Sequence, residues 1–225
     1  MAERPYFSRA TFTFLKDLAA NNERSWFEAN RERYEDHVKI PALRFIQDFA
    51  PVLDGISPHF RAGPRSLFRI HRDVRFSMDK SPYKTHTGIQ FRHARARDVH
   101  APGFYLHVEP GGSFVGLGMW HPVGPALRQV RERIVEHPDE WIAAVEAPAF
   151  GRTFEREGDR LTRAPRGFDA EHPLVEELKW KDHLGVRSVP ESFVTDPDLP
   201  RKLGEVLVAG TPLMRFLCAA VDADF

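Results

Sequence analysis

The sequence predicts an α+β fold, with a mainly antiparallel sheet in the middle of the chain covered by N- and C-terminal helices. Apolar side chains recur at helical spacing in the first 55 residues and again after residue 125, whereas between residues 66 and 120 they alternate with polar ones. The strand–helix alternation that a parallel dinucleotide-binding sheet requires is missing. No repeat or linker divides the chain, so we expect a single domain over residues 1–225.

The composition is that of an ordinary soluble protein. Its 32 basic and 32 acidic side chains cancel, so the net charge favours neither nucleic acid nor an anionic membrane. The single cysteine, Cys218, lies in an apolar run and cannot form an internal disulfide, which favours a reducing compartment. The sequence has no charged-then-apolar leader and no apolar run of about 20 residues that would span a bilayer. We therefore expect a cytoplasmic protein with no membrane partner.

The first helices are predicted from their caps and apolar stripes. Ser8 is placed to cap the first helix, and Asn22 to cap the second. The aromatic stripe of the second helix includes a polar residue, Asn30, which needs a buried partner; we expect that partner in the polar connection of residues 67–85. Pro41 should interrupt this helix and can begin another.

The middle of the chain is predicted to form the sheet. Alternation from residue 66 and again over residues 87–91 predicts two strands joined by the polar connection. Residues 104–120 predict a hairpin. Closing it at its two adjacent glycines pairs Phe104 with Met119 and puts every strong hydrophobe on one face. The opposite face then carries polar side chains over glycines.

After the sheet the chain returns to helical spacing. Helices are expected at four places: residues 127–135, 141–145, 203–208 and 213–221. Asp169 is placed to cap a further helix that ends at Leu178. Residues 156–166 should form a loop, and residues 186–189 a short edge strand.

Five cations stand between the two predicted strands. Arginine grips phosphate or carboxylate through two hydrogen bonds, and lysine adds a compact charge. Trp120 can stack on a base or ring. We predict that an anionic ligand binds through these residues: Arg69, Arg72, Asp73, Arg75, Asp79, Lys80, Tyr83, Lys84 and Trp120. In the simpler alternative, the side chains lie on a solvated turn whose aspartates pair with its arginines.

The polar face of the predicted hairpin is the candidate reaction site. Histidine and glutamate within reach of each other perform general acid–base chemistry. We predict His107 as the general acid or base and Glu109 as the group that orients it, with Tyr105 beside them. The alternative is a polar network that satisfies its own hydrogen bonds beneath a helix.

Neither a metal nor a cofactor is predicted. His71, His86 and His107 can converge, but none shows the H-x-x-x-H or C-x-x-C spacing that would be specific, so we expect no metal site. The chain has no Walker lysine loop, G-x-G-x-x-G, G-x-S-x-G or H-E-x-x-H motif, and its cofactor is therefore unknown.

Several motifs resemble those of a known family. The R-D-x-R-F-S-x-D-K-[ST]-P-Y-K-T run that begins at Arg72, together with Asn21-Asn22 and Glu109-Pro110-Gly111-Gly112, resembles the signature of domain of unknown function 2461 over nearly the whole chain. That family is uncharacterised, so the resemblance implies no reaction, cofactor or partner. It weighs against His71 as a catalytic group. The positions that match are Arg72, Asp73, Arg75, Asp79, Lys80, Tyr83, Lys84, Tyr105 and His107.

The leading prediction is an intracellular enzyme or ligand-binding domain for a phosphate-bearing small molecule or nucleotide. One alternative is a nucleic-acid-binding module, in which the basic patch of residues 61–97 contacts phosphates while Tyr105 and Trp120 stack on bases. Another is a structural or protein-interaction domain whose arginines pair internally. The oligomeric state is left open.

Overall fold

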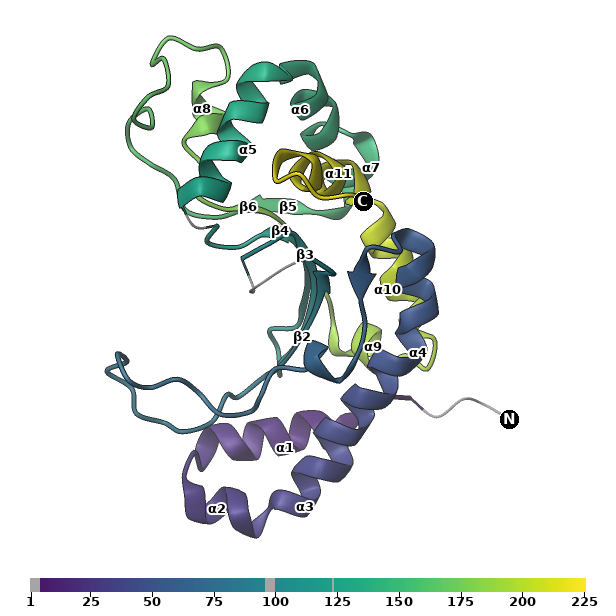
Figure 1. Ribbon diagram of the computed structural model, residues 1–225. Helices are drawn as coiled ribbons and strands as arrows, with labels where there is room; N and C mark the ends of the chain where they lie inside the picture. Colours follow the sequence, from purple (N-terminus) through teal and green to yellow (C-terminus); the bar gives the residue numbers. More distant parts are fainter. Residues whose placement is uncertain (1–4, 96–99, 123) are drawn as a thin grey trace.

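The computed structural model describes residues 5–95, 100–122 and 124–225 (Figure 1). A six-stranded antiparallel sheet lies between groups of helices from the two ends of the chain, which confirms the α+β class. The strand order is β1-β2-β3-β4-β6-β5. The strands are β1 (Phe60–Arg61), β2 (Thr87–His93), β3 (Gly103–Val108), β4 (Phe114–Met119), β5 (Glu155–Glu157) and β6 (His183–Ser188).

Helices precede and follow the central strands. Before the sheet are α1 (Arg9–Ala20), α2 (Arg24–Ala29), α3 (Arg31–Tyr34) and α4 (Ile40–Ile56), with a π-helical turn over Glu35–Lys39 and a 3-10 turn over Pro64–Ser66. After β4 come α5 (Gly124–Glu136), α6 (Pro138–Val145), α7 (Pro148–Thr153), α8 (Val175–Leu178), α9 (Glu191–Val194), α10 (Leu199–Val208) and α11 (Thr211–Ala220). None of the helices described is by itself long and apolar enough to cross a membrane; α10 and α11 together would be, but they meet at a 65° bend.

Two helix starts agree with the sequence prediction. The Ser8 hydroxyl accepts a hydrogen bond from the Ala10 amide at the start of α1. Pro41 lies in the first turn of α4, where its missing N–H removes no helical hydrogen bond.

Two asparagines behave differently from the prediction. Asn22 does not cap α2, which begins after Glu23; its side chain reaches another part of the chain instead. The side chain of Asn30 bonds locally to the Trp26 carbonyl and to Arg33, so the predicted contact with residues 67–85 is wrong.

One face of the central strands is packed against helices. Ile89, Phe91, Phe104 and Leu106 are completely buried there, and Phe49 of α4 lies with its ring centroid 4.8 Å from that of Phe91. Helices α4 and α10 lie on this side of the sheet in Figure 1. Each such side chain contributes about 1.5–3 kcal/mol through burial, so this face anchors the sheet.

The β3–β4 hairpin has a register two residues away from the prediction. Phe104 pairs with Leu117 rather than Met119. The chain reverses in a type II turn centred on Pro110 and Gly111, because proline suits the second position and the φ of +72° at Gly111 suits the third. A shift of two residues keeps every side chain on its predicted face, so the polar and apolar faces are as expected.

Other strand predictions need correction. The strand expected from residue 66 is not part of the sheet; that segment makes only isolated bridges, Leu67 with Ile89 and His71 with Tyr83. Strand β6 is not at the edge, because β5 pairs along its outer side; the last two residues of β5 belong to the stretch predicted as a loop. Of the helix predicted to end at Leu178, only the last turn forms, as α8.

Residues 67–86, which we call the arm, leave the sheet and extend beside α1 (Figure 1). The base of the arm contributes Ile70 and Tyr83 to a second, smaller core. This burial explains why the segment leaves the sheet, since its apolar side chains pack on the helices instead. The other buried members of the second core come from the N-terminal helices: Phe14, Leu15, Leu18, Phe27, Tyr34 and Val38.

His183 of β6 predicts a pH dependence of stability. Its ring is buried, and within the described residues neither ring nitrogen has a hydrogen-bond partner. Desolvation, and then the charges of Arg156 and Arg131, lower its pKa from 6.5 to about 3. Below pH 6.5 His183 therefore binds a proton in the unfolded chain but stays neutral in the folded chain. This difference lowers the free energy of unfolding as the pH falls toward 3.

We expect this group to remove about 2 kcal/mol of stability between pH 7 and pH 5. The variant His183→Leu should lose that part of the pH dependence. Chemical denaturation of both proteins at the two pH values measures the difference; an identical pH dependence in the variant would show that His183 is protonated normally in the folded chain.

Candidate functional site

The sheet face opposite α4 and α10 carries the predicted polar side chains, and we call it the open face. Within the described residues, no helix lies over its middle in Figure 1. Gly88 of β2 lies opposite His107 of β3, which in turn lies opposite Phe114 of β4. Tyr105 is flanked in the same way by Gln90 and Gly116. Glycines and aromatic rings thus surround the two polar residues of β3.

Tyr105, His107 and Glu109 form a hydrogen-bonded row, which we call the polar chain. They are two residues apart along one strand, so their side chains point to the same face. The Tyr105 hydroxyl lies 3.0 Å from Nδ1 of His107, and Nε2 of His107 lies 3.1 Å from Oε2 of Glu109. The structure therefore brings together the three residues predicted to be catalytic.

The hydrogen-bond donors and acceptors of the three side chains determine which atoms of the polar chain carry protons. A carboxylate only accepts hydrogen bonds, so Nε2 of His107 carries the proton and donates it to Glu109, and Nδ1 accepts from the Tyr105 hydroxyl. Burial lowers the pKa of His107 more than Glu109 raises it. Burial likewise raises the pKa of Tyr105. The row thus consists of a neutral tyrosine, a neutral histidine and a carboxylate.

His86, just before β2, completes the group. Its ring centroid lies 4.2 Å from that of His107, and its nitrogens make no hydrogen bond to any residue that the structure describes. Desolvation, followed by the neighbouring His107, lowers the pKa of His86 to about 4. One ligand atom from each of His86, His107 and Glu109 lies within 4.8 Å of the other two. These three residues can therefore hold a metal ion, although the sequence predicted none.

Gly88 makes room for the polar chain. A Cβ atom at this position would lie 2.5 Å from the Tyr105 hydroxyl and 3.1 Å from the Phe68 ring. Only glycine allows the tyrosine hydroxyl to pass over β2 toward His107.

Two cations border the polar chain. The Phe68 ring packs against Tyr105 at 6.0 Å, with Lys84 Nζ 5.4 Å and the Arg92 guanidinium 5.9 Å from the ring centroid. Desolvation, and then the charge of Arg69, lowers the pKa of Lys84. Among the described residues, neither Lys84 nor Arg92 forms an ion pair. Of the predicted anion-binding cations, Lys84 is the one that this packing places beside the polar chain.

The other cations of the arm pair mostly with aspartates and carbonyls of the arm itself. Arg72 pairs with Asp79 and also donates to the Ser81 carbonyl at 3.1 Å. Arg75 pairs with Asp73 at 2.6 Å. This is the pairing expected of the structural alternative; anion binding by these residues stays a prediction.

Backbone and hydroxyl groups complete the network in the arm. Lys80 donates to the Val74 carbonyl at 2.9 Å. Hydrogen bonds from Ser81, and then from Arg72, lower the pKa of Asp79 to about 2, while Arg75 does the same for Asp73. Both aspartates are therefore ionised at neutral pH and hold the arm in shape.

Asn22 fixes the base of the arm. Its side-chain oxygen accepts from the Tyr83 amide at 3.0 Å and its NH₂ donates to the Tyr83 carbonyl at 2.9 Å. The Tyr83 ring stacks on Phe27 at 4.1 Å and is only 3% exposed. Tyr83, predicted to contact a ligand, therefore packs in the second core.

Two residues that the sequence did not single out stand at the tip of the arm. Phe76 and Met78 are 96% and 99% exposed. Their apolar character gave no sign of this exposure, which follows from the pairing of the charged residues around them.

Trp120 lies away from the polar chain. It follows β4 at the end opposite Phe114, is 50% exposed, and stacks on His121 at 4.4 Å and on His100 at 5.7 Å. In the basic patch of residues 61–97, Arg97 lies outside the described residues, and Arg95 pairs with Asp224 at 3.3 Å. The structure thus does not bring together the aromatic pair predicted to stack on bases.

The comparison with known families agrees with the motifs. A family model described as a conserved hypothetical protein, DUF2461, matches residues 10–216. The chain belongs to this family. The matched region includes the polar chain, His86 and the whole arm. No curated protein and no solved structure matches the chain.

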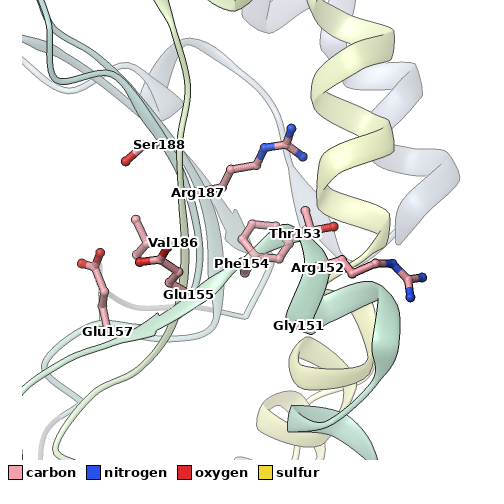
Figure 2. Close-up of a pocket in the computed structure, with 9 residues that line it drawn as sticks. All are labelled: Gly151, Arg152, Thr153, Phe154, Glu155, Glu157, Val186, Arg187 and Ser188. Atoms are coloured by element: carbon pink, nitrogen blue, oxygen red, sulfur yellow. The ribbon is translucent and has the colours of Figure 1, made fainter.

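The open face of this DUF2461 protein continues into a pocket at its far edge (Figure 2). The pocket has a volume of about 250 Å³, and β5, β6 and α7 line it. Val186 and Ser188 of β6 lie opposite Gly116 and Phe114, so they share the face of the polar chain. Its lining carries two carboxylates, Glu155 and Glu157, and two guanidinium groups, Arg152 and Arg187.

The close approach of the Tyr105 hydroxyl to Gly88 can be tested in this DUF2461 protein. Gly88→Ala should displace the Tyr105 hydroxyl and cost about 1–3 kcal/mol through overpacking. Gly55→Ala is the matched control, because nothing lies within 4 Å of its new Cβ in α4; we expect it to be neutral or stabilising by up to about 1 kcal/mol. Chemical denaturation measures the free energy of unfolding of both variants. Equal values would contradict the close approach of the Tyr105 hydroxyl to Gly88.

A second test concerns the base of the arm. Asn22→Ala removes both hydrogen bonds to Tyr83 and should speed amide hydrogen exchange in the arm by about 5- to 10-fold, as expected for about 1 kcal/mol of lost local stability. Asn30→Ala, whose side chain bonds within its own helical region, is the control. Unchanged exchange in the arm of the Asn22 variant would mean that the second core alone holds it.

Proposed function

We propose that this protein is a cytoplasmic ligand-binding protein for a phosphate-bearing small molecule or nucleotide, bound on the open face with its reacting part at His107. The observation that carries the proposal is the position of Lys84 and Arg92, two cations beside Tyr105 that form no ion pair with a described residue. The buried free thiol of Cys218 supports the reducing compartment.

The charges of Lys84 and Arg92 suit a bound anion. The Lys84 ammonium is partly desolvated and donates to the neutral Arg69 carbonyl at 2.8 Å, so a negative partner would still stabilise its charge. Arg92 adds a planar fork for two phosphate oxygens. The Phe68 ring between them provides an apolar surface for the rest of the ligand.

The polar chain supports an acid–base role at the same place. His107 is neutral, and Tyr105 and Glu109 hold its ring from both sides, as a proton-transfer group requires. A ligand whose phosphate lies at Lys84 extends over Tyr105 toward this histidine.

The charge distribution favours a small molecule over a nucleic-acid strand. The register with β6 places Glu155 and Glu157 on the open face, where their carboxylates would repel a long polyanion that ran there from the cations of β2; the two arginines of the same pocket, Arg152 and Arg187, offset part of this repulsion. A compact ligand with its negative charge at one end fits this gradient.

Alanine variants of the two cations test the proposal. Isothermal titration with inorganic phosphate, adenosine monophosphate and a sugar phosphate should show binding that Lys84→Ala or Arg92→Ala weakens about 10- to 100-fold, the loss expected for a hydrogen bond to a charged group. Arg128→Ala, which removes an exposed ion pair on α5, should leave the affinity unchanged.

The variant Arg75→Ala separates the open face from the arm. Weaker binding in this variant, with normal binding in the Lys84 variant, would place the phosphate at the Arg75–Asp73 part of the arm instead of beside Tyr105. Absence of binding by all three compounds would overturn the proposed function.

A further inference from the structure

We propose that His86, His107 and Glu109 form a binding site for a divalent transition-metal ion of the zinc class. The proposal rests on the proposed function only for the location of the reacting centre, since the ion binds whether or not a phosphate does. Two imidazoles and one carboxylate are the donor set of known catalytic zinc sites.

The distances fit such an ion. Zinc bonds of about 2.0–2.1 Å in a tetrahedral arrangement place neighbouring ligand atoms about 3.4 Å apart. Nε2 of His107 and Oε2 of Glu109 are 3.1 Å apart, which is close to that spacing. The remaining separations are at most 4.8 Å, so the ring of His86 has to approach by no more than about 1.4 Å. His86 lies just before β2, outside the strand ladder.

The surroundings of the ligands are those of a metal centre. Metal-binding histidines almost always donate their other ring N–H to an oxygen, which fixes the ring. The Tyr105 hydroxyl oxygen stands 3.0 Å from Nδ1 of His107 and provides that oxygen. The Thr85 hydroxyl donates to Oε1 of Glu109 at 3.5 Å, so the carboxylate is also held from behind.

Ion binding shifts one proton within the polar chain. In the metal-free chain Nε2 of His107 donates to Glu109; the ion takes the place of that proton, and the neutral ring then carries its proton on Nδ1 and donates to Tyr105. The Nε2 proton moves to Nδ1, with solvent as the carrier, so the charge of the ring is unchanged.

Three protein ligands leave the ion a coordination position toward the open face. Tetrahedral zinc takes a fourth ligand, which a water or a phosphate oxygen can provide. An ion held by His86, His107 and Glu109 would supply Lewis-acid chemistry and would lower the pKa of a water bound to it. Lys84 would stay available to the phosphate of the ligand.

Zinc binding to chelator-treated protein tests the site. Equilibrium dialysis and competition with a chromophoric chelator should find one ion per chain. His86→Ala and Glu109→Gln should each weaken binding by about 100-fold or more, and Tyr105→Phe by about 10-fold, because the last removes only an outer partner. His137→Ala, which removes an exposed histidine near α6, is the matched control and should bind normally.

The outcomes separate this inference from the proposed function. No zinc binding, or binding that survives His86→Ala and Glu109→Gln in folded protein, overturns the metal site; phosphate binding by the chelated protein would then leave the proposed function standing. Zinc binding without phosphate binding supports the metal site and overturns the proposed function. Thermal melts confirm that each variant is folded, and Glu109→Gln keeps the side-chain volume should an alanine variant unfold.

Discussion

The pairing of β2 with β3 is the constraint on which the candidate site depends. It places Gly88 opposite His107, and the absent side chain at Gly88 lets the Tyr105 hydroxyl reach the histidine. The same pairing brings His86, at the start of β2, against the His107 ring. The apolar face of both strands is buried under helices, so a register shift by one residue would bury the polar chain and expose the core. The packing of the apolar face therefore fixes the positions of the polar side chains on the opposite face.

Charge is divided between two parts of the molecule. In the arm, aspartates neutralise Arg72 and Arg75 and give the segment a defined shape above a small core of its own. Beside the open face, Lys84 and Arg92 have no such partner among the described residues. Exposed ion pairs contribute little to stability, so the arm network acts mainly through shape, whereas a partly desolvated cation such as Lys84, whose partner is the neutral Arg69 carbonyl, favours binding of an anion. The long basic motif thus combines a structural part with one residue, Lys84, that faces the site.

Much of this arrangement follows from patterns in the sequence. The α+β class and the two sheet faces follow from residue periodicity, and parity kept Tyr105, His107 and Glu109 on one face even though the hairpin register was wrong by two. The error came from turn chemistry, since Pro110-Gly111 is a better centre than the two glycines. Long-range contacts could not be predicted from the sequence. The hydrogen bonds between Asn22 and Tyr83 and the approach of His86 to His107 depend on how separate segments pack. No local spacing marks the proposed metal-binding group, because His86 precedes β2 whereas His107 lies in β3.

The tautomer of His107 tests the account most directly. Nitrogen-15 NMR of the histidine rings distinguishes a proton on Nε2 from one on Nδ1. At neutral pH the metal-free protein should show a neutral His107 protonated on Nε2, because Glu109 accepts from that nitrogen and Tyr105 donates to the other. A His107 that is protonated on Nδ1, or that carries both protons at pH 7, would contradict the polar chain as described.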